Sequence, residues 1–425
     1  MNVRALLTSA PPALSFGHNM KTFYGWRIVV AGGALQFLQS LLLNQAFGAY
    51  LAVLVSERGW SKTALSGAAA LKSTEAAILG PVLGWMIDRF GAQGLIRAGI
   101  VTFGIGFMLL SQIDSIAGFY GAFVVIALGA SMCSNQPVSV VIIHWFERNR
   151  ARALSGVQFG SALGGIFVVA IAWSIQTFGW RTTAFASGVI SIVIGWPLAR
   201  MIRSRPDPDE QTDLVQAPIS ESAIAGVAAP RAFTAREALR TSAFWLISLG
   251  HAFSLFVVSA VNVHAITHIK EGLGYTLAQA SLVLTLVTVG QFFGVMAGWT
   301  IGEKFEKRLV AATCMLMHAA GLLMITYANG PVALAIAALI HGSAWGLRGP
   351  FMQAIRADYF GRRSIGMILG LSSMVTVIGQ IGGPIVAGVF ADTMGTYRWG
   401  FTLLALLAGL GSLFFYWATP PRHPN

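Results

Sequence analysis

Apolar residues fill long stretches of this chain, and short polar stretches separate them. A helix needs roughly 20 apolar residues to cross about 30 Å of hydrocarbon, so stretches of this length predict membrane-spanning helices. None of them alternates polar and apolar positions in the manner of a barrel strand. We therefore predict an all-α membrane protein with twelve spanning helices, at residues 27–55, 63–87, 95–113, 118–145, 151–178, 181–203, 241–270, 276–300, 309–328, 331–359, 363–393 and 397–417.

A polar motif recurs at one fixed offset along the chain. The run Gly84-Trp85-Met86-Ile87-Asp88-Arg89-Phe90-Gly91 is followed, 214 residues after Gly84, by Gly298-Trp299-Thr300-Ile301-Gly302-Glu303-Lys304-Phe305. The same offset carries Phe146 onto Phe360, Arg148 onto Arg362 and Gly156 onto Gly370. Sequence motifs that recur in the same order at one spacing indicate that one half of the chain is a duplicate of the other. We predict a six-helix bundle at 27–203 and a second at 241–417.

The polar segments outside the bundles have their own composition. Residues 204–240 include Pro206, Pro208 and four closely spaced acids, and this composition predicts a linker between the halves. A short amphipathic piece at 233–239 is predicted to lie on the inner membrane surface. Residues 1–26 and 418–425 are predicted to be a cytoplasmic amino-terminal segment, with no cleaved signal peptide, and a cytoplasmic tail.

Composition and charge agree with a membrane protein. The 425 residues are 55% hydrophobic and only 10% charged, and the formal net charge is +12. Most of the 28 Lys and Arg lie at the two ends, in the long middle segment and in the even-numbered connections. Positive residues favour the cytoplasmic side of a membrane. The charge therefore predicts orientation, with both ends cytoplasmic, and not nucleic-acid binding.

Twelve helices in two halves, with the motif Gly84-x-x-x-Asp88-Arg89-x-Gly91 and a later Arg97 between the second and third, resemble the major facilitator superfamily. The resemblance implies alternating access, in which the acid pairs with bases and a helix end to latch the cytoplasmic side. The second copy has an inserted Gly302 and no glycine after Phe305, so we expect the first copy to dominate. The predicted gating residues are Gly84, Asp88, Arg89, Gly91, Arg97, Arg148, Arg152, Glu303 and Lys304.

Two further segments are similar to the signatures of one branch of that superfamily. These are Tyr24-Gly25-Trp26-Arg27 and the run from Trp145 to Gly156, and they resemble the monocarboxylate transporters and the bacterial oxalate/formate antiporters. That branch commonly carries an arginine in its eighth helix. Here residues 276–300 offer only Thr285, Thr288 and Gln291 as polar candidates. The branch's anion-binding residue therefore has no counterpart by position.

A charge inside the bilayer costs about 2.5–3.5 kcal/mol even on a lenient scale, so each one needs a reason. Arg348 lies well inside the tenth predicted helix, and His341, Trp345 and Met352 share its face. The resemblance implies that this helix lines the central pathway. A guanidinium beside an indole suits a carboxylate substrate. The alternative is a structural cation held by helix-end carbonyls or by Glu75.

Glu75 is the only carboxyl predicted deep within a span, and Lys72 lies three residues before it. A self-contained pair would lower the insertion cost of both charges. The same pair could instead carry a coupled proton. Both interpretations stay open.

Further polar candidates lie in the helices that the resemblance places around the cavity. Helix 7 offers His251 and, eleven residues later on nearly the same face, Asn262. Helix 1 offers Gln36 and Gln39, and helix 4 offers Asn135, two residues before Pro137, which permits a bend. Neutral amides there can bind substrate oxygens, or they can tie helices together at about 0.6 kcal/mol each.

The predicted function is a secondary transporter of small organic anions, mono- or dicarboxylates, with alternating access and a coupled proton as an option. The alternative is a proton-driven exporter of lipophilic compounds, because 27 Phe and 12 Trp could line a promiscuous pocket. We predict no enzyme activity, no cofactor, no metal site and no nucleic-acid partner. The expected setting is the plasma (inner) membrane, where the chain contacts lipid as a monomer.

Overall fold

The computed structural model describes residues 23–60, 62–206 and 232–422, and these are almost entirely helical. The amino-terminal half contains α1 (Tyr24–Gln39), η1 (Ser40–Gln45), α2 (Phe47–Arg58), α3 (Lys62–Phe90), α4 (Ala92–Leu110), α5 (Ile116–Met132), α6 (Asn135–Trp145), α7 (Arg150–Ile166), α8 (Val168–Phe178) and α9 (Trp180–Met201). The carboxyl-terminal half contains α10 (Ala235–Leu239), α11 (Ser242–Thr267), η3 (His268–Gly272), α12 (Leu277–Ile301), α13 (Lys307–Thr326), α14 (Pro331–Phe360), α15 (Ile365–Met394) and α16 (Arg398–Trp417).

Eleven helices in the described part of the chain are long and apolar enough to cross a membrane. Four of them are composite, because α1, η1 and α2 follow one another, as do α5 and α6, α7 and α8, and α11 and η3. The remaining predicted span, 63–87, corresponds to the 29-residue helix α3. The prediction of an all-α membrane protein with about twelve spans is confirmed, and each predicted boundary lies within three residues of the observed one.

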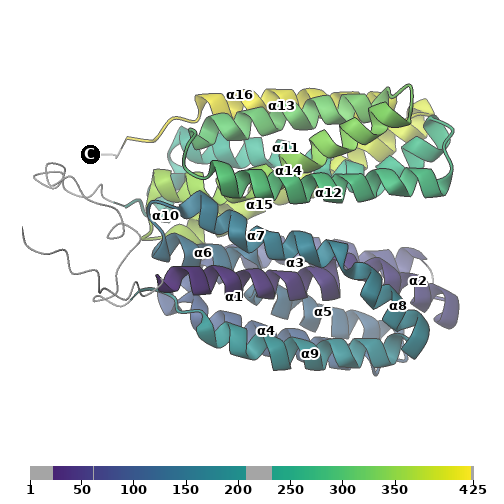
Figure 1. Ribbon diagram of the computed structural model, residues 1–425, viewed down its shortest axis with the longest axis horizontal. Coiled ribbons are helices and arrows are strands. Elements are labelled where there is room, and N and C mark those ends of the chain that lie inside the picture. Colours follow the sequence, from purple (N-terminus) through teal and green to yellow (C-terminus); the bar gives the residue numbers. More distant parts are fainter. Residues whose placement is uncertain (1–22, 61, 207–231, 423–425) are drawn as a thin grey trace, which may run out of the picture.

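The two halves lie side by side as parallel bundles (Figure 1). Pro206 and Ala232 lie within the predicted linker, and they are the described residues on either side of 207–231. We call the end of the molecule at which they lie the linker end, and the opposite end the far end. The beginning of α1 and the end of α16 also lie at the linker end (Figure 1). Residues 1–22, 207–231 and 423–425, which include most of the predicted terminal segments and linker, lie outside the described residues.

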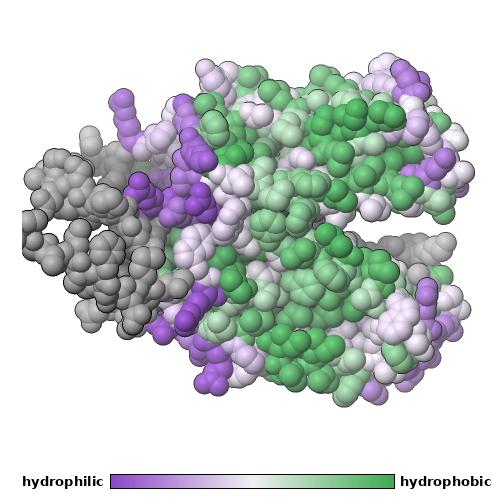
Figure 2. Space-filling model, in the orientation of Figure 1, coloured by the Kyte–Doolittle hydropathy of each residue, from purple (hydrophilic) through white to green (hydrophobic). Residues whose placement is uncertain are grey.

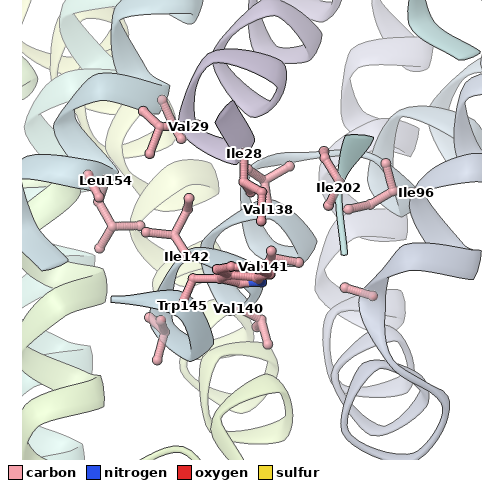
Figure 3. Packing of buried hydrophobic residues seen from close by; sticks show 14 of the residues in the cluster. Ile28, Val29, Ile96, Val138, Val140, Val141, Ile142, Trp145, Leu154 and Ile202 are labelled. Carbon is pink, nitrogen blue, oxygen red and sulfur yellow. The ribbon is translucent and has the colours of Figure 1, made fainter. Parts of the chain in front are cut away.

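The halves share a hydrophobic core only toward the linker end. One cluster of buried residues is centred on Trp145 and includes Ile28, Val138 and Leu154 of the amino-terminal half (Figure 3). Phe351, Ala354, Ala357, Ile365 and Leu369 of the carboxyl-terminal half belong to the same cluster. Toward the far end, separate clusters serve each half. Figure 2 shows the surface hollowed between the halves at the far end. The structure is thus closed at the linker end and open at the far end.

Glycines allow the closest approach between the halves, where α3 packs on α15. A Cβ added at Gly84 would lie 2.3 Å from the carbonyl oxygen of Gly366, and one at Gly370 would lie 2.3 Å from that of Gly80. Any larger residue at these positions must push the helices apart. The repeated small residues therefore set the distance at which polar groups of the two halves meet.

The predicted amphipathic piece is the short helix α10, which packs at the linker end. Thr234 and Glu237 form a capping box at its start, and Phe233 is buried against Phe360 with ring centroids 5.7 Å apart. The backbone N–H of Phe233 donates to the carbonyl of Phe360 at 3.0 Å. This segment therefore fixes the beginning of the second half to the linker end of α14.

Candidate gate and transport site

Asp88 joins α3 to the start of a helix in the other half. Its two carboxylate oxygens accept the backbone N–H groups of Gly366 and Met367, each at 2.8 Å. These are among the first N–H groups of α15, which have no partner within their own helix. A negative charge there is also favoured by the helix dipole. We call this contact the first latch, and it is the arrangement that the motif predicts.

Glu303 makes the matching contact from the second copy of the motif. Its Oε1 accepts the backbone N–H of Ala151 at 2.5 Å, at the start of α7 in the amino-terminal half. Arg152 donates from Nε to the carbonyl of Trp299 at 3.2 Å. The inserted Gly302 has a φ of +52°, a conformation that favours glycine, and it ends α12 just before the acid. We call this contact the second latch, and it forms despite the altered motif.

Ion pairs that the sequence did not reveal surround the second latch. Arg150 pairs with Asp358 across the two halves, and Lys307 bridges Asp358, at 2.8 Å, and Glu303. Arg362 pairs with Glu147 at 2.6 Å, also across the halves. Arg150 is 7% exposed, so this network is only partly screened by solvent. The three arginines at 148–152 indicated that acidic partners lie nearby. The sequence did not indicate which acids these are, because they lie some 200 residues away along the chain.

The other predicted gating residues play smaller parts in this conformation. Arg89 lies over the rings of Trp85 and Phe90, 5.4 and 5.5 Å from their centroids. Gly91 has a φ of +81°, and it lets the chain turn beside Ser204. The remaining three are Arg97, whose Nε has no hydrogen-bond partner among the described residues, and Arg148 and Lys304, both exposed.

The predicted amides of helices 1 and 4 mostly tie helices together. Gln39 donates to the carbonyl of Ala130 at 3.0 Å, and Gln36 donates to that of Cys133 at 3.5 Å. Both carbonyls lie where the fourth span breaks between α5 and α6. Asn135 accepts from Ser139 at 3.3 Å within α6. These bonds fit the interhelical alternative, and a substrate role stays a prediction.

Gln136, next to Asn135, reaches further. Its amide donates to the carbonyls of Gly80 at 3.2 Å and Gly366 at 3.3 Å, one in each half. It therefore adds a third polar contact beside the first latch. The sequence placed this amide in helix 4 but did not indicate partners in both halves.

Arg348 is enclosed within the carboxyl-terminal half. Its side chain is 1% exposed, and its Nε and one terminal nitrogen have no hydrogen-bond partner among the described residues. The guanidinium carries a permanent charge and five donors. In the described helices from α11 to α16, the carboxylates are Glu271, Asp358 and Asp392, and each of them lies near an end of the bundle. A cation without an internal counter-charge therefore lies inside this bundle.

His341 and Trp345 stand on the same helix as Arg348, but they do not form one open wall. His341 is fully buried, and its Nδ1 lies 3.2 Å from Nδ1 of His318 in α13. The ring therefore faces a neighbouring helix of its own half. Trp345 is half-buried against the core of the same half. Sequence reasoning did not consider His318, although its position within α13 places it inside a span.

A second buried arginine lies two turns beyond the first. Arg356 donates to the carbonyl of Met352 at 2.7 Å and to Ser372 at 2.6 Å, and it lies 3.3 Å from Nδ1 of His251 in α11. All of these partners are neutral. Asn262, further along α11, is exposed and has no contact with this cluster in the described structure. His251 therefore lies close to a buried arginine, but this arginine is Arg356 and not Arg348.

The predicted pair of Lys72 and Glu75 is only partly described. Both residues lie in α3, and Glu75 is half-buried. The side chain of Lys72 lies outside the described residues. The pairing of these two charges stays a prediction.

Two like halves of spanning helices, joined by polar contacts at one end and parted at the other, have the architecture of a multi-pass membrane transporter. Sequence comparison agrees with this class. The profile of the Major Facilitator Superfamily matches residues 32–265 and 247–425, so the chain belongs to that superfamily.

Individual relatives place the chain broadly within the superfamily. It is 30% identical to the MFS-type transporter pynF of Aspergillus niger, over 44% of each chain, so that match spans less than half of either protein. It is 21% identical to Multidrug resistance protein 2 of Bacillus subtilis, over 79% of this chain and 81% of that protein. The crystal structure of the human organic anion transporter MFSD10 superposes with a TM-score of 0.72 at 14% identity, covering 92% and 99% of the two chains. The carboxylate branch suggested by the signatures stays a prediction.

Proposed function

We propose that this transporter carries small organic anions, mono- or dicarboxylates, and that Arg348 binds their carboxylate. The observation that carries the proposal is the buried guanidinium with unpartnered donors. A lone charge at this depth costs about 2.5–3.5 kcal/mol on the lenient scale, so it needs a function that repays the cost. A planar fork of N–H donors matches a carboxylate in both charge and shape.

Alternating access follows from the two ends of the molecule. In the conformation observed, an anion enters from the far end. The latches at the linker end must then break while the far end closes, which presents the anion to the other side. Lys and Arg are concentrated at the two ends of the chain, in the middle segment and in the even-numbered connections. This distribution supports an orientation in which the protein lies in the plasma (inner) membrane and its linker end faces the cytoplasm. We propose that the chain works as a monomer, because each chain holds both halves of the gate.

Proton coupling through Glu75 is part of the proposal, since this carboxyl lies within α3 away from the linker-end latches. Glu75→Gln should abolish proton-driven accumulation but keep exchange of substrate for substrate. Lys72 would favour the ionised form of the acid in one state of the cycle. His251, Asn262, Gln36, Gln39 and Asn135 remain proposed contributors to substrate binding.

A second candidate function has its own observation. A groove of about 450 Å³ opens between α1, α7 and α12, and every residue along it is apolar or glycine: Val29, Val30, Gly33, Ala34, Gly156, Phe159, Gly160, Leu163 and Trp299. A lipophilic compound could enter this groove sideways from the membrane. The similarity to a multidrug resistance protein favours the same alternative, a proton-driven exporter.

Thermal stability with candidate ligands separates the two functions. A ligand at 100 times its dissociation constant stabilises the folded protein by about 2.7 kcal/mol. We expect stabilisation by formate, lactate, oxalate or succinate, and not by a lipophilic cation such as tetraphenylphosphonium. Arg348→Lys should lose it, because an ammonium does not reproduce the planar fork, whereas Arg308→Lys, at an arginine paired with Glu306, should keep it. Stabilisation by the cation alone would favour the exporter, and full binding in Arg348→Lys would make Arg348 a structural cation.

A further inference from the structure

Two buried histidines meet between α13 and α14. His318 and His341 are both fully buried, their Nδ1 atoms are 3.2 Å apart, and their ring centroids are 4.8 Å apart. Nε2 of each ring has no hydrogen-bond partner among the described residues. No other element contributes a hydrogen bond to either ring in the part of the chain that the structure describes. The two rings therefore depend on each other.

The geometry limits how many protons the pair holds. A hydrogen bond between two Nδ1 atoms needs one ring to donate its N–H and the other to accept with its lone pair. In the neutral pair, the donor ring has a free lone pair on Nε2. One added proton can form an N–H bond there and leave the shared hydrogen bond intact. A second added proton would have to occupy the accepting Nδ1 and break that bond. The pair is thus a site for one proton.

The charges around the pair determine when the pair can bind an extra proton. The charged group near both rings is Arg348, on the same helix as His341. Arg348 in turn lies near Cys314, one turn from His318, and near His251, which contacts Arg356. All of them are cationic or neutral. An added positive charge in this buried region is unfavourable unless a negative charge arrives with it. The anion proposed at Arg348 would supply that charge.

We propose that the His318–His341 pair binds the proton that accompanies each substrate anion, so that anion and proton load together. This inference rests on the proposed function, because the anion at Arg348 is what makes the protonated pair favourable. Water at the open end gives the proton and receives it again on release, and no other bond changes. The pair would then act before Glu75 in proton coupling.

Proton uptake on ligand binding tests this inference. Purified full-length protein in weakly buffered solution at neutral pH, with a pH-indicator dye, is mixed with formate, lactate, oxalate or succinate, and ligand binding is measured in parallel by calorimetry. We expect the wild-type protein to take up one proton with each anion. His318→Gln and His341→Gln should bind the anion more weakly and take up no proton. His264→Gln is the matched control, because His264 lies in a span and contacts the carbonyl of Pro384, away from the pair.

Each outcome decides between the claims. Anion binding with proton uptake that persists in His318→Gln or His341→Gln would overturn the inference and leave the proposed function standing. Anion binding without proton uptake in the wild type would do the same. If no carboxylate binds the wild type, both claims fail together. The two single variants test the inference independently. One variant that folds is therefore enough to decide, and folding is judged by elution as a single species in size-exclusion chromatography.

Discussion

The polar contacts at one end of this molecule join the two halves, whereas those at the other end lie within one half. At the linker end, Asp88 and Glu303 each bind the start of a helix in the other half, and Arg150 and Asp358 form an ion pair across the halves. At the far end, Asp114 pairs with Arg58 at 2.9 Å and with Arg181 at 2.7 Å, all within one half. Contacts between halves must break in each cycle, whereas contacts within a half can persist. We therefore propose that the linker end is the gate and that the far-end network belongs to a rigid body.

The two latches differ from each other in a smaller way. Asp88 accepts two backbone N–H groups, whereas Glu303 accepts one and shares its charge with Lys307. Hydrogen bonds to a charged group are worth about 1.5–3 kcal/mol each when a partner is removed. We expect the first latch to be the stronger, although the second forms fully.

Adding a single methyl group between α3 and α15 should have the largest effect. In Gly84→Ala the new Cβ would lie 2.3 Å from a backbone oxygen of Gly366, so the helices must separate and the first latch must lengthen. Overpacking of this kind costs about 3 kcal/mol at the upper end of its usual range. We expect loss of transport in proteoliposomes and loss of the conformation closed at the linker end. Gly94→Ala, with open space around its Cβ, is the control, and equal transport in the two variants would contradict the packing argument.

Neutralising the latches should have a moderate and unequal effect. Asp88→Asn removes the charge that holds two N–H groups, and a loss of about 2 kcal/mol shifts the balance of open and closed linker ends by roughly 30-fold. Glu303→Gln should shift it less, by roughly fivefold for about 1 kcal/mol. Both variants should bind substrate nearly normally but transport it more slowly. Equilibrium binding and initial uptake rates check this, and a larger effect of Glu303→Gln would reverse the ranking of the latches.

At the far end, neutralising an acid should leave the gate unchanged. Asp114→Asn removes contacts within one half, so transport should stay close to normal. The hydrogen bond from Arg58 and the nearby charge of Arg181 lower the pKa of Asp114. The contribution of these pairs to stability is therefore complete above the ordinary pKa, about 4, and is lost as the pH falls through the lowered value. The melting temperatures of wild type and Asp114→Asn should differ slightly at pH 6 and converge below pH 4. A difference in melting temperature that stays constant with pH would show that the charge of Asp114 does not cause it.

Much of the fold could be predicted from the sequence, because lipid leaves few choices. Long apolar stretches must be helices, and their ends follow the first polar residues, so the predicted ends of all twelve spans were close to the observed ones. The repeat at an offset of 214 residues indicated two halves. The break in the fourth span was suggested by Pro137, which stands in the first turn of α6, where its missing N–H costs nothing. What the sequence could not show was that the halves meet at one end only, since this depends on which conformation of the cycle is populated.

The site could be predicted less well, because helical spacing gives a face and not the neighbour that covers it. Arg348 and His341 do share a helix face, but the residue opposite His341 is His318, from a helix that no motif marks. The second latch was underestimated because its motif was judged by its glycines. The contact depends on where the Glu303 carboxylate stands relative to the start of α7, and Gly302 provides that turn. The network of Arg150, Asp358 and Lys307 joins residues far apart in the chain, so no local pattern predicted it.

The central claim is that the two acid latches hold the linker end closed while the far end is open. Pulsed electron paramagnetic resonance tests it directly, with spin labels across the halves at exposed positions: Met201 and Trp417 at the linker end, and Phe178 and Val332 at the far end. Cys133 and Cys314 are buried and are replaced by alanine beforehand. With Asp88→Asn and Glu303→Gln combined, we predict that the distance across the linker end increases and the distance across the far end decreases. Unchanged distances in that double variant, or an increase at both ends together, would contradict the account.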